Sequence, residues 1–374
     1  FDQWPLAQNL SFTFSDRFSF TENDGIVFPR DAVRNDLREA YFTWEPTTAT
    51  FLEFGRVNLK NGIALGFNPT DFFKTRSAVA LASADPSALR GDRLGTLMLR
   101  AQTIWDGGSA TFVYAPKLHT PRPLVGAAPS WIDPGFDQTN ASDRFLFALN
   151  LELGDLSPQA LVYHESGRTK IGLNISRPIG QSVIAYGEWT GGSEPNLIAQ
   201  AIAYGKATGT LPSFAPVLPP ASTSHAFQND LAVGASWTSE AKITLNLEYH
   251  FHQAGFSGAD WNNWFDIGAA GPLAASELWY VRGFASAMQQ PISRQQIFWR
   301  ADWQDAFIQN FELSGISFVN LTDGSGMAQI SANYNLSNAW SVGLYAGGTF
   351  GGRRSEWGSL PGASNAIFQV VRYF

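Results

Sequence analysis

Polar and apolar residues alternate with a period of two along most of this chain. Between residues 245 and 252, apolar and polar side chains take strict turns: Leu245, Leu247, Tyr249 and Phe251 against Asn246, Glu248, His250 and His252. Successive side chains of a β-strand point to opposite faces, so the pattern predicts strands with one apolar and one polar face. In lipid all backbone N–H and C=O groups must be paired, which only helices and closed barrels achieve. The repeated alternation therefore predicts an all-β transmembrane barrel with a wet interior.

The segments that alternate predict a single antiparallel up-and-down barrel domain over residues 1–374, with about 16 strands. Their links separate into short turns and long loops, as periplasmic turns and extracellular loops do in such barrels. Both termini are then expected on the periplasmic side. Asp16 and Glu53 fall on nominally outward positions, so either a bulge or an early exit from the lipid is expected in their strands. The expected strands are 9–21, 35–45, 49–60, 93–105, 109–117, 143–153, 157–165, 168–178, 182–191, 228–238, 241–253, 295–305, 309–319, 326–336, 338–349 and 364–374.

Composition excludes several classes of protein. Charged residues make up 15% of the chain, against roughly 25% in ordinary soluble domains. No stretch approaches the ~20 apolar residues of a membrane helix. Cysteine is absent, which excludes disulfides, thiolate metal sites and haem attachment motifs. The net charge of −7 argues against a nucleic-acid partner.

Charged residues on the predicted inner face are segregated along the chain. Basic residues dominate the first half and acidic residues the second, which suggests two opposed walls whose field would orient dipolar solutes. The alternative is that lumen charges only pair with one another and attract water. The predicted pore-lining residues are Arg17, Arg56, Lys60, Arg100, Arg144, Lys170, Glu188, Asp230, Glu248, Arg300 and Asp302.

Two long links have unusual composition. Residues 61–92 are too apolar to extend into water, so we expect them to fold into the barrel as a constriction, with a short helix near 77–83. Capping the barrel from outside is the alternative. Residues 260–266 place Trp261 and Trp264 beside Asn and Asp, an arrangement that suits either stacking on sugar rings or holding a long loop together.

One region resembles a known family. Leu37-Arg38-Glu39-Ala40-Tyr41-Phe42-Thr43-Trp44, Gly55-Arg56, Asn61-Gly62 and Phe67-Asn68-Pro69-Thr70-Asp71 resemble a pattern of Gram-negative alginate-export-type porins and related uncharacterised barrels. The resemblance covers about forty residues, and Val57 stands where that pattern prefers Gln. It implies an outer-membrane barrel in which Arg56 lines the pore, without implying the substrate.

Catalytic and metal-binding motifs are not recognised. There is no Gly-x-Ser-x-Gly elbow, Walker loop or His-Glu-x-x-His helix, so we expect no enzyme activity, no catalytic residues and no cofactor. Glu248, His250 and His252 share one face, yet neighbours two apart on a strand need further ligands to hold a metal. We therefore expect lumen histidines in contact with water and no metal site.

Two functions remain open. The first is an outer-membrane channel, a porin or exporter, for hydrophilic or anionic solutes including oligo- or polysaccharide. The second is a barrel scaffold or sheath for a periplasmic or extracellular partner, such as a multihaem cytochrome or an export lipoprotein. Expected partners are outer-membrane lipids and lipopolysaccharide, and the barrel-assembly machinery reading Val370–Phe374. A homo-oligomer or a periplasmic partner protein is left open.

Overall fold

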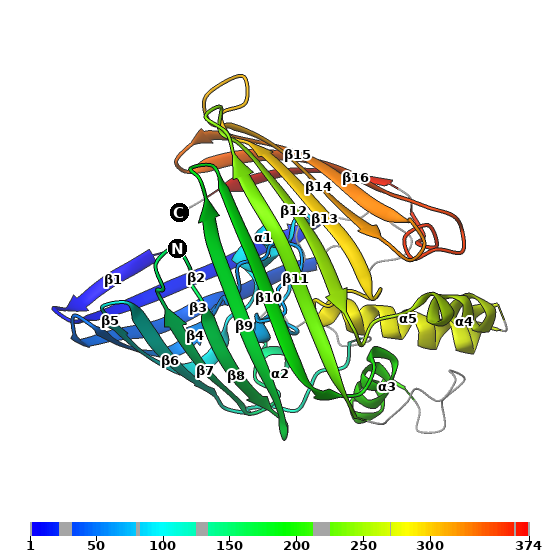
Figure 1. The fold of residues 1–374 in the computed structure, drawn as a ribbon, viewed down its shortest axis with the longest axis horizontal. Coiled ribbons are helices and arrows are strands. Elements are labelled where there is room, and N and C mark those ends of the chain that lie inside the picture. The colour runs from blue at the N-terminus through cyan, green and yellow to red at the C-terminus, as the bar shows by residue number, and fades with distance from the viewer. Residues whose placement is uncertain are drawn as a thin grey trace.

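Seventeen strands form one antiparallel sheet in which each strand pairs with the next along the chain (Figure 1). The computed structural model describes residues 2–21, 32–79, 83–124, 134–211, 225–269, 271–362 and 364–372. The strands are β1 (Asp2–Ala7), β2 (Leu10–Thr21), β3 (Ala32–Thr47), β4 (Thr50–Val57), β5 (Thr96–Trp105), β6 (Gly108–Ala115), β7 (Arg144–Leu151), β8 (Gln159–Glu165), β9 (Arg168–Ile179), β10 (Val183–Glu194), β11 (Ala226–Thr238), β12 (Ile243–His252), β13 (Gln295–Trp303), β14 (Phe311–Asn320), β15 (Gly326–Ser337), β16 (Trp340–Phe350) and β17 (Ser364–Arg372). The predicted fold class, all-β and up-and-down, is confirmed.

The sheet curls around a central space and is open between its first and last strands. Within the described part of the chain, the paired registers join consecutive strands, from β1 with β2 to β16 with β17. Figure 1 shows β17 and β1 as the two edges, with both chain ends near them. The architecture is therefore a barrel wall that has not closed on itself.

The long loops lie at one end of the sheet, as predicted, although the links after β8 and β14 at that end are short. Each odd-numbered strand is joined to the next by a short turn, and the longest links follow even-numbered strands. This ordering puts the long loops at one end of the sheet and the tight turns at the other. The short turns include 48–49, 106–107, 180–182, 239–242 and 338–339, and the long loops are 58–95, 116–143, 195–225 and 253–294.

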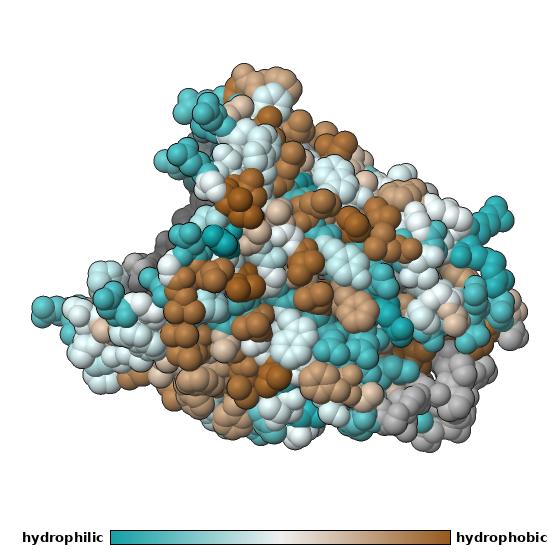
Figure 2. Space-filling model, in the orientation of Figure 1, coloured by the Kyte–Doolittle hydropathy of each residue, from teal (hydrophilic) through white to brown (hydrophobic). Residues whose placement is uncertain are grey.

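The two faces of the sheet differ as the alternation predicts. In β12, Leu247 is 58% exposed on the outer face, whereas Glu248 and His250 on the inner face are each 1% exposed. In β7, Phe147 is exposed and Arg144 is fully buried. Figure 2 shows hydrophobic side chains gathered over the outer face of the strands. A polar inner face and an apolar outer face are thus established.

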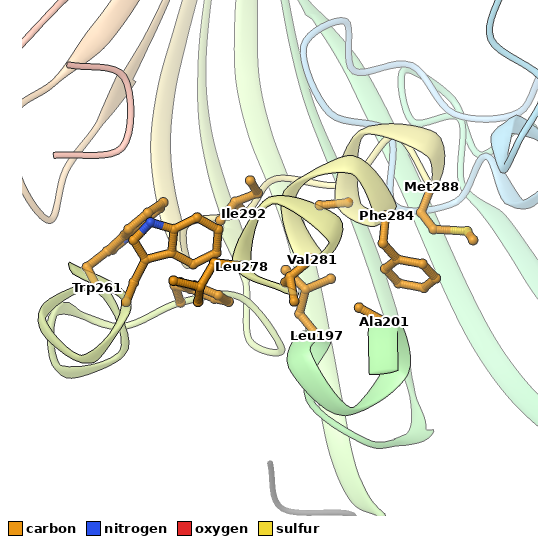
Figure 3. Close-up of a cluster of buried hydrophobic side chains, with 11 residues drawn as sticks. Leu197, Ala201, Trp261, Leu278, Val281, Phe284, Met288 and Ile292 are labelled. Carbon is orange, nitrogen blue, oxygen red and sulfur yellow. The ribbon is translucent and has the colours of Figure 1, made fainter. Parts of the chain in front are cut away.

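Helices from two long loops pack together at the long-loop end of the sheet. They are α3 (Leu197–Ala207), α4 (Gly258–Gly268) and α5 (Pro272–Ala287), and Leu197, Trp261 and Phe284 contribute to their shared buried core (Figure 3). A capping box of Ser257 and Asp260 begins α4, satisfying N–H groups that have no partner within the helix. Trp261 and Trp264 are buried in this core, where they hold the loop together.

None of the described helices is both long and apolar enough to cross a membrane.

Two predictions about the elements need correction. Strand β1 was not predicted. The helix expected near 77–83 is wrong where it is described, because residues 77–79 are irregular and residues 80–82 lie outside the described residues. The helix is instead α1 (Pro86–Asp92), where Asp85 accepts from the Ser87 N–H and Pro86 occupies the first turn, both favourable at a helix start.

The two nominally outward acids have different explanations. The register of β2 with β3 shifts between Ser15 and Asp16, so the bulge expected there is confirmed. Glu53 was wrongly assigned to the outer face, because its carboxylate lies 2.9 Å from the Arg100 guanidinium on the inner face.

Candidate functional site

The inner loop, defined as residues 58–95 between β4 and β5, crosses to the opposite wall of the barrel. It contains a 3-10 turn (Phe72–Lys74) and α1, and Figure 1 shows α1 within the curve of the sheet. The Glu188 carboxylate on β10 accepts hydrogen bonds from the backbone N–H groups of Ile63 and Ala64, the latter at 2.5 Å. The Thr70 hydroxyl donates to the same carboxylate at 3.0 Å. Glu188 thus holds two points of the inner loop at once.

A second carboxylate, Glu248 on β12, holds the next residues of the inner loop. Its two oxygens accept from the N–H groups of Leu65 at 2.6 Å and Gly66 at 2.9 Å. The Tyr186 hydroxyl also donates to Glu248 at 2.6 Å, and the His250 ring nitrogen lies 2.8 Å away. Hydrogen bonds to an ionised, buried acceptor are among the stronger ones in proteins. Two buried carboxylates therefore anchor one short run of backbone.

Glycines allow the inner loop to approach these carboxylates. Gly62 has φ of +83°, and a Cβ there would lie 2.5 Å from the carboxylate oxygens of Glu188. A Cβ on Gly66 would lie 2.5 Å from the Phe298 ring and 2.7 Å from His250. Gly62 requires glycine for its positive φ and its close contact, and Gly66 for its close contact. Gly62 and Gly66 are therefore the residues that make the double anchor sterically feasible.

Further contacts hold the inner loop to the other strands. Phe72 stacks on Tyr163 of β8 with ring centroids 4.3 Å apart. Arg300 of β13 donates to the Ser87 hydroxyl at 2.8 Å, and the Gln329 side chain of β15 accepts from the Ala84 N–H at 2.8 Å. The loop therefore contacts the wall at β8, β10, β12, β13 and β15.

An internal ion pair stiffens the inner loop itself. Arg93 is 1% exposed and Asp71 is 2% exposed. The guanidinium of Arg93 donates to both Asp71 oxygens, at 2.8 and 3.1 Å, the two-pronged geometry that is strongest between these groups. Arg90 lies 3.6 Å from the same carboxylate. Both cations come from the end of the loop and bind its middle, so they close it into a compact unit.

Most of the charges predicted to line the pore lie beside an opposite charge. The acidic residue Asp230 lies 2.6 Å from the His252 ring nitrogen. Charges paired at this range project little field across the lumen, so the hypothesis of two opposed walls stays a prediction. The close ion pairs are Arg17 with Asp92, Arg100 with Glu53, Arg144 with Glu165, Lys170 with Glu194, and Arg300 with Asp302 and Asp85.

Two predicted residues have other surroundings. Arg56 is 3% exposed, donates to the Pro134 carbonyl, and lies with its guanidinium 5.8 Å from the centre of the Phe136 ring. Lys60 is exposed at the start of the inner loop. Arg56 therefore contacts the 116–143 loop.

A cavity of about 560 Å³, here called the chamber, lies between the inner loop, α5 and the 351–362 loop. Its charged lining comprises Lys74, Arg90, Arg93 and Arg282 with Asp71 and Glu356. Burial lowers the pKa of the Lys74 ammonium to about 8 and raises the pKa of the Glu356 carboxyl to about 7. Sequence reasoning missed these residues because they come from loops, where no periodicity marks which side chains face inward.

Each of the two histidines of β12 lies against a different carboxylate, and the two are not grouped around a common point. His250 contacts Glu248, and His252 contacts Asp230. Among the described residues, no group of three or more His, Asp or Glu side chains is placed to hold a metal ion. The C-terminal residues Tyr373 and Phe374 of the expected assembly signal lie outside the described residues.

Comparison with known proteins gives matches of structure only. No family model matches the chain, and no curated protein matches it significantly. Pseudomonas aeruginosa OccK11 (OpdR) matches with a TM-score of 0.49 and 9% identity over 98% of this chain and 90% of that one. A mutant of the Rhodopseudomonas blastica porin matches with a TM-score of 0.46 and 8% identity over 97% of this chain and 99% of that one. The second is a porin, the class of barrel that the sequence resembles, but a likeness of this size does not assign a function.

Proposed function

We propose that this chain is a single-domain outer-membrane channel for small hydrophilic solutes, narrowed by its inner loop. The observation that carries the proposal is the double anchor of residues 63–70 on Glu188 and Glu248, across the lumen from the strands that the loop connects. A barrel of about 16–18 strands without such a loop is wide enough for an aqueous channel. A loop held inside it would set the size limit for solutes.

The outer face supports a membrane location. Outward side chains in mid-strand are apolar, as with Leu173 on β9, Val233 on β11 and Ile330 on β15, which are 46%, 39% and 62% exposed. Exposed apolar area of this extent is unfavourable in water and favourable against lipid tails. Outer-membrane lipid and lipopolysaccharide are therefore the proposed surroundings, and assembly of the barrel would use the barrel-assembly machinery.

The inner face supports passage of polar rather than apolar solutes. Polar residues such as Asn246, Gln329 and Ser331 face inward alongside both signs of charge. Side chains of this kind replace part of the water that a polar solute loses on entry. Preference for anionic solutes or saccharides is the finer part of the proposal. The inner loop occupies space that a threaded partner protein would need, so we do not propose the sheath function.

Swelling of liposomes that contain the purified protein tests this function. We expect arabinose and glucose to enter quickly and trisaccharides slowly, because the inner loop limits the width. Liposomes with the same mass of heat-denatured protein are the control. Equal swelling with and without the folded protein would contradict the channel function.

A further inference from the structure

We propose that the chamber binds an organic anion that carries an apolar body, such as a carboxylate on a hydrocarbon ring. The inference rests on the proposed channel function, because the solute would reach the chamber through the lumen. The chamber lies between the inner loop and α5, with the 351–362 loop beside them. Its position would place a bound solute directly against the constriction.

The charges around the chamber favour an anion. Four cations and two carboxylates line it, so 4 − 2 leaves two positive charges in excess. Asp71 is already held by Arg93 and Arg90. Among the described residues, neither Lys74 nor Arg282 has a carboxylate within 4 Å; Lys74 donates to the Asn68 carbonyl at 2.6 Å and Arg282 to the Glu356 carbonyl at 2.5 Å. A buried cation without a carboxylate in direct contact is costly, and an anionic solute would relieve that cost at the buried Lys74 and the half-buried Arg282.

The rest of the lining favours an apolar body. Aromatic and aliphatic side chains of Phe67, Leu89, Trp279, Phe318 and Trp357 border the chamber. Removing apolar surface of a solute from water against such a lining is worth about 25 cal/mol per Å². A small, fully hydrophilic anion would gain nothing from these side chains.

Besides Arg90 Nε, which lies 3.6 Å from the Asp71 carboxylate, two buried polar atoms in the lining have no hydrogen-bond partner within the described structure. They are Trp357 Nε1 and Gln290 Oε1, and both residues border the chamber. Trp357 Nε1 can only donate, so it suits an acceptor such as a carboxylate oxygen. Unpaired buried polar groups are rare in proteins, and a bound carboxylate would satisfy the Trp357 donor. The chamber volume of about 560 Å³ lies within the range of small-molecule sites.

Calorimetric titration of the full-length protein in detergent tests the inference with matched probes. Cyclohexanecarboxylate carries both required features, cyclohexanemethanol lacks the charge, and acetate lacks the apolar body. We expect cyclohexanecarboxylate to bind one site at least tenfold more tightly than either of the others. Lys74→Met and Arg282→Gln should each weaken its binding about tenfold, which corresponds to about 1.4 kcal/mol.

Control variants remove equivalent charges far from the chamber. Arg177→Gln and Lys242→Met lie at exposed positions paired with Asp155 and Asp305 and should bind like the wild type. The change in gel mobility on heating checks that every variant folds. Equal binding of cyclohexanemethanol, or unchanged binding in both chamber variants, would overturn the inference. Absent binding in a protein that still swells liposomes would overturn the inference and leave the channel function intact. Binding without swelling would support the inference and contradict the channel function.

Discussion

At the residue scale, Gly62 determines whether the inner loop can reach its anchor. Gly62→Ala forces a side chain into φ of +83° and against the Glu188 carboxylate. The backbone strain alone costs about 1–2 kcal/mol, and the contact adds to it. We expect the N–H groups of Ile63 and Ala64 to exchange hydrogen for deuterium faster than in the wild type.

Gly180→Ala is the matched control for this substitution. Gly180 has φ of +65° in a tight turn, and a Cβ there would have no atom within 4 Å. It shares the strain and lacks the contact, so exchange in the inner loop should stay at the wild-type rate. Identical exchange in both variants would show that Gly62 has no special role in anchoring the loop.

Two residues give the chamber a pH dependence. Glu356 has its pKa raised to about 7 and Lys74 has its pKa lowered to about 8, both chiefly by burial. Below pH 7 the carboxyl is neutral and the ammonium is charged, which favours binding of an anion. Above pH 8 the carboxyl is charged and the ammonium is neutral, which disfavours it. We therefore expect the affinity for cyclohexanecarboxylate to fall between pH 6 and 9, measured by calorimetry at each pH.

Substituting Glu356 separates the contributions of the two groups to the pH dependence of binding. Glu356→Gln should abolish the fall near pH 7 and keep the fall near pH 8. An affinity that rises with pH, or that is flat in the wild type, would contradict these assignments.

At the element scale, the strands were predictable because one physical pattern repeats in each. Most strands have a polar and an apolar face, so residue parity alone placed Glu188 and Glu248 inside the lumen. Strand β1 was missed because it has only six residues and includes Pro5. The helix of the inner loop was misplaced because its start depends on the Asp85 cap rather than on the Ala/Ser-rich composition.

The outer face of a strand can be tested directly. Leu247→Arg places a charge at a 58% exposed position on β12, which costs about 2–4 kcal/mol near the middle of a bilayer. Ile308→Arg, at a 57% exposed position in the turn after β13, is the control and should cost little. Urea unfolding in phospholipid vesicles measures both, and equal losses of stability would argue that β12 does not face lipid.

At the scale of the whole molecule, the site was only half predictable. The two anchoring carboxylates could be placed inside the barrel by periodicity. Their partners lie more than 100 residues earlier in the chain, since Ala64 pairs with Glu188 and Leu65 with Glu248. No local pattern encodes such a pairing, because it depends on how the curved wall brings distant strands around the loop. The chamber has the same origin, being built from three separate loops.

Single-channel conductance in a planar lipid bilayer tests the central claim, a lumen narrowed by an anchored inner loop. Glu188→Gln with Glu248→Gln weakens both carboxylate anchors, and Glu45→Gln with Glu240→Gln removes the same charge from exposed turn-side positions. We predict small steps for the wild type and the control, and larger, more variable steps for the anchor variant. Steps of one size in all three proteins, or no steps in any, would contradict the account.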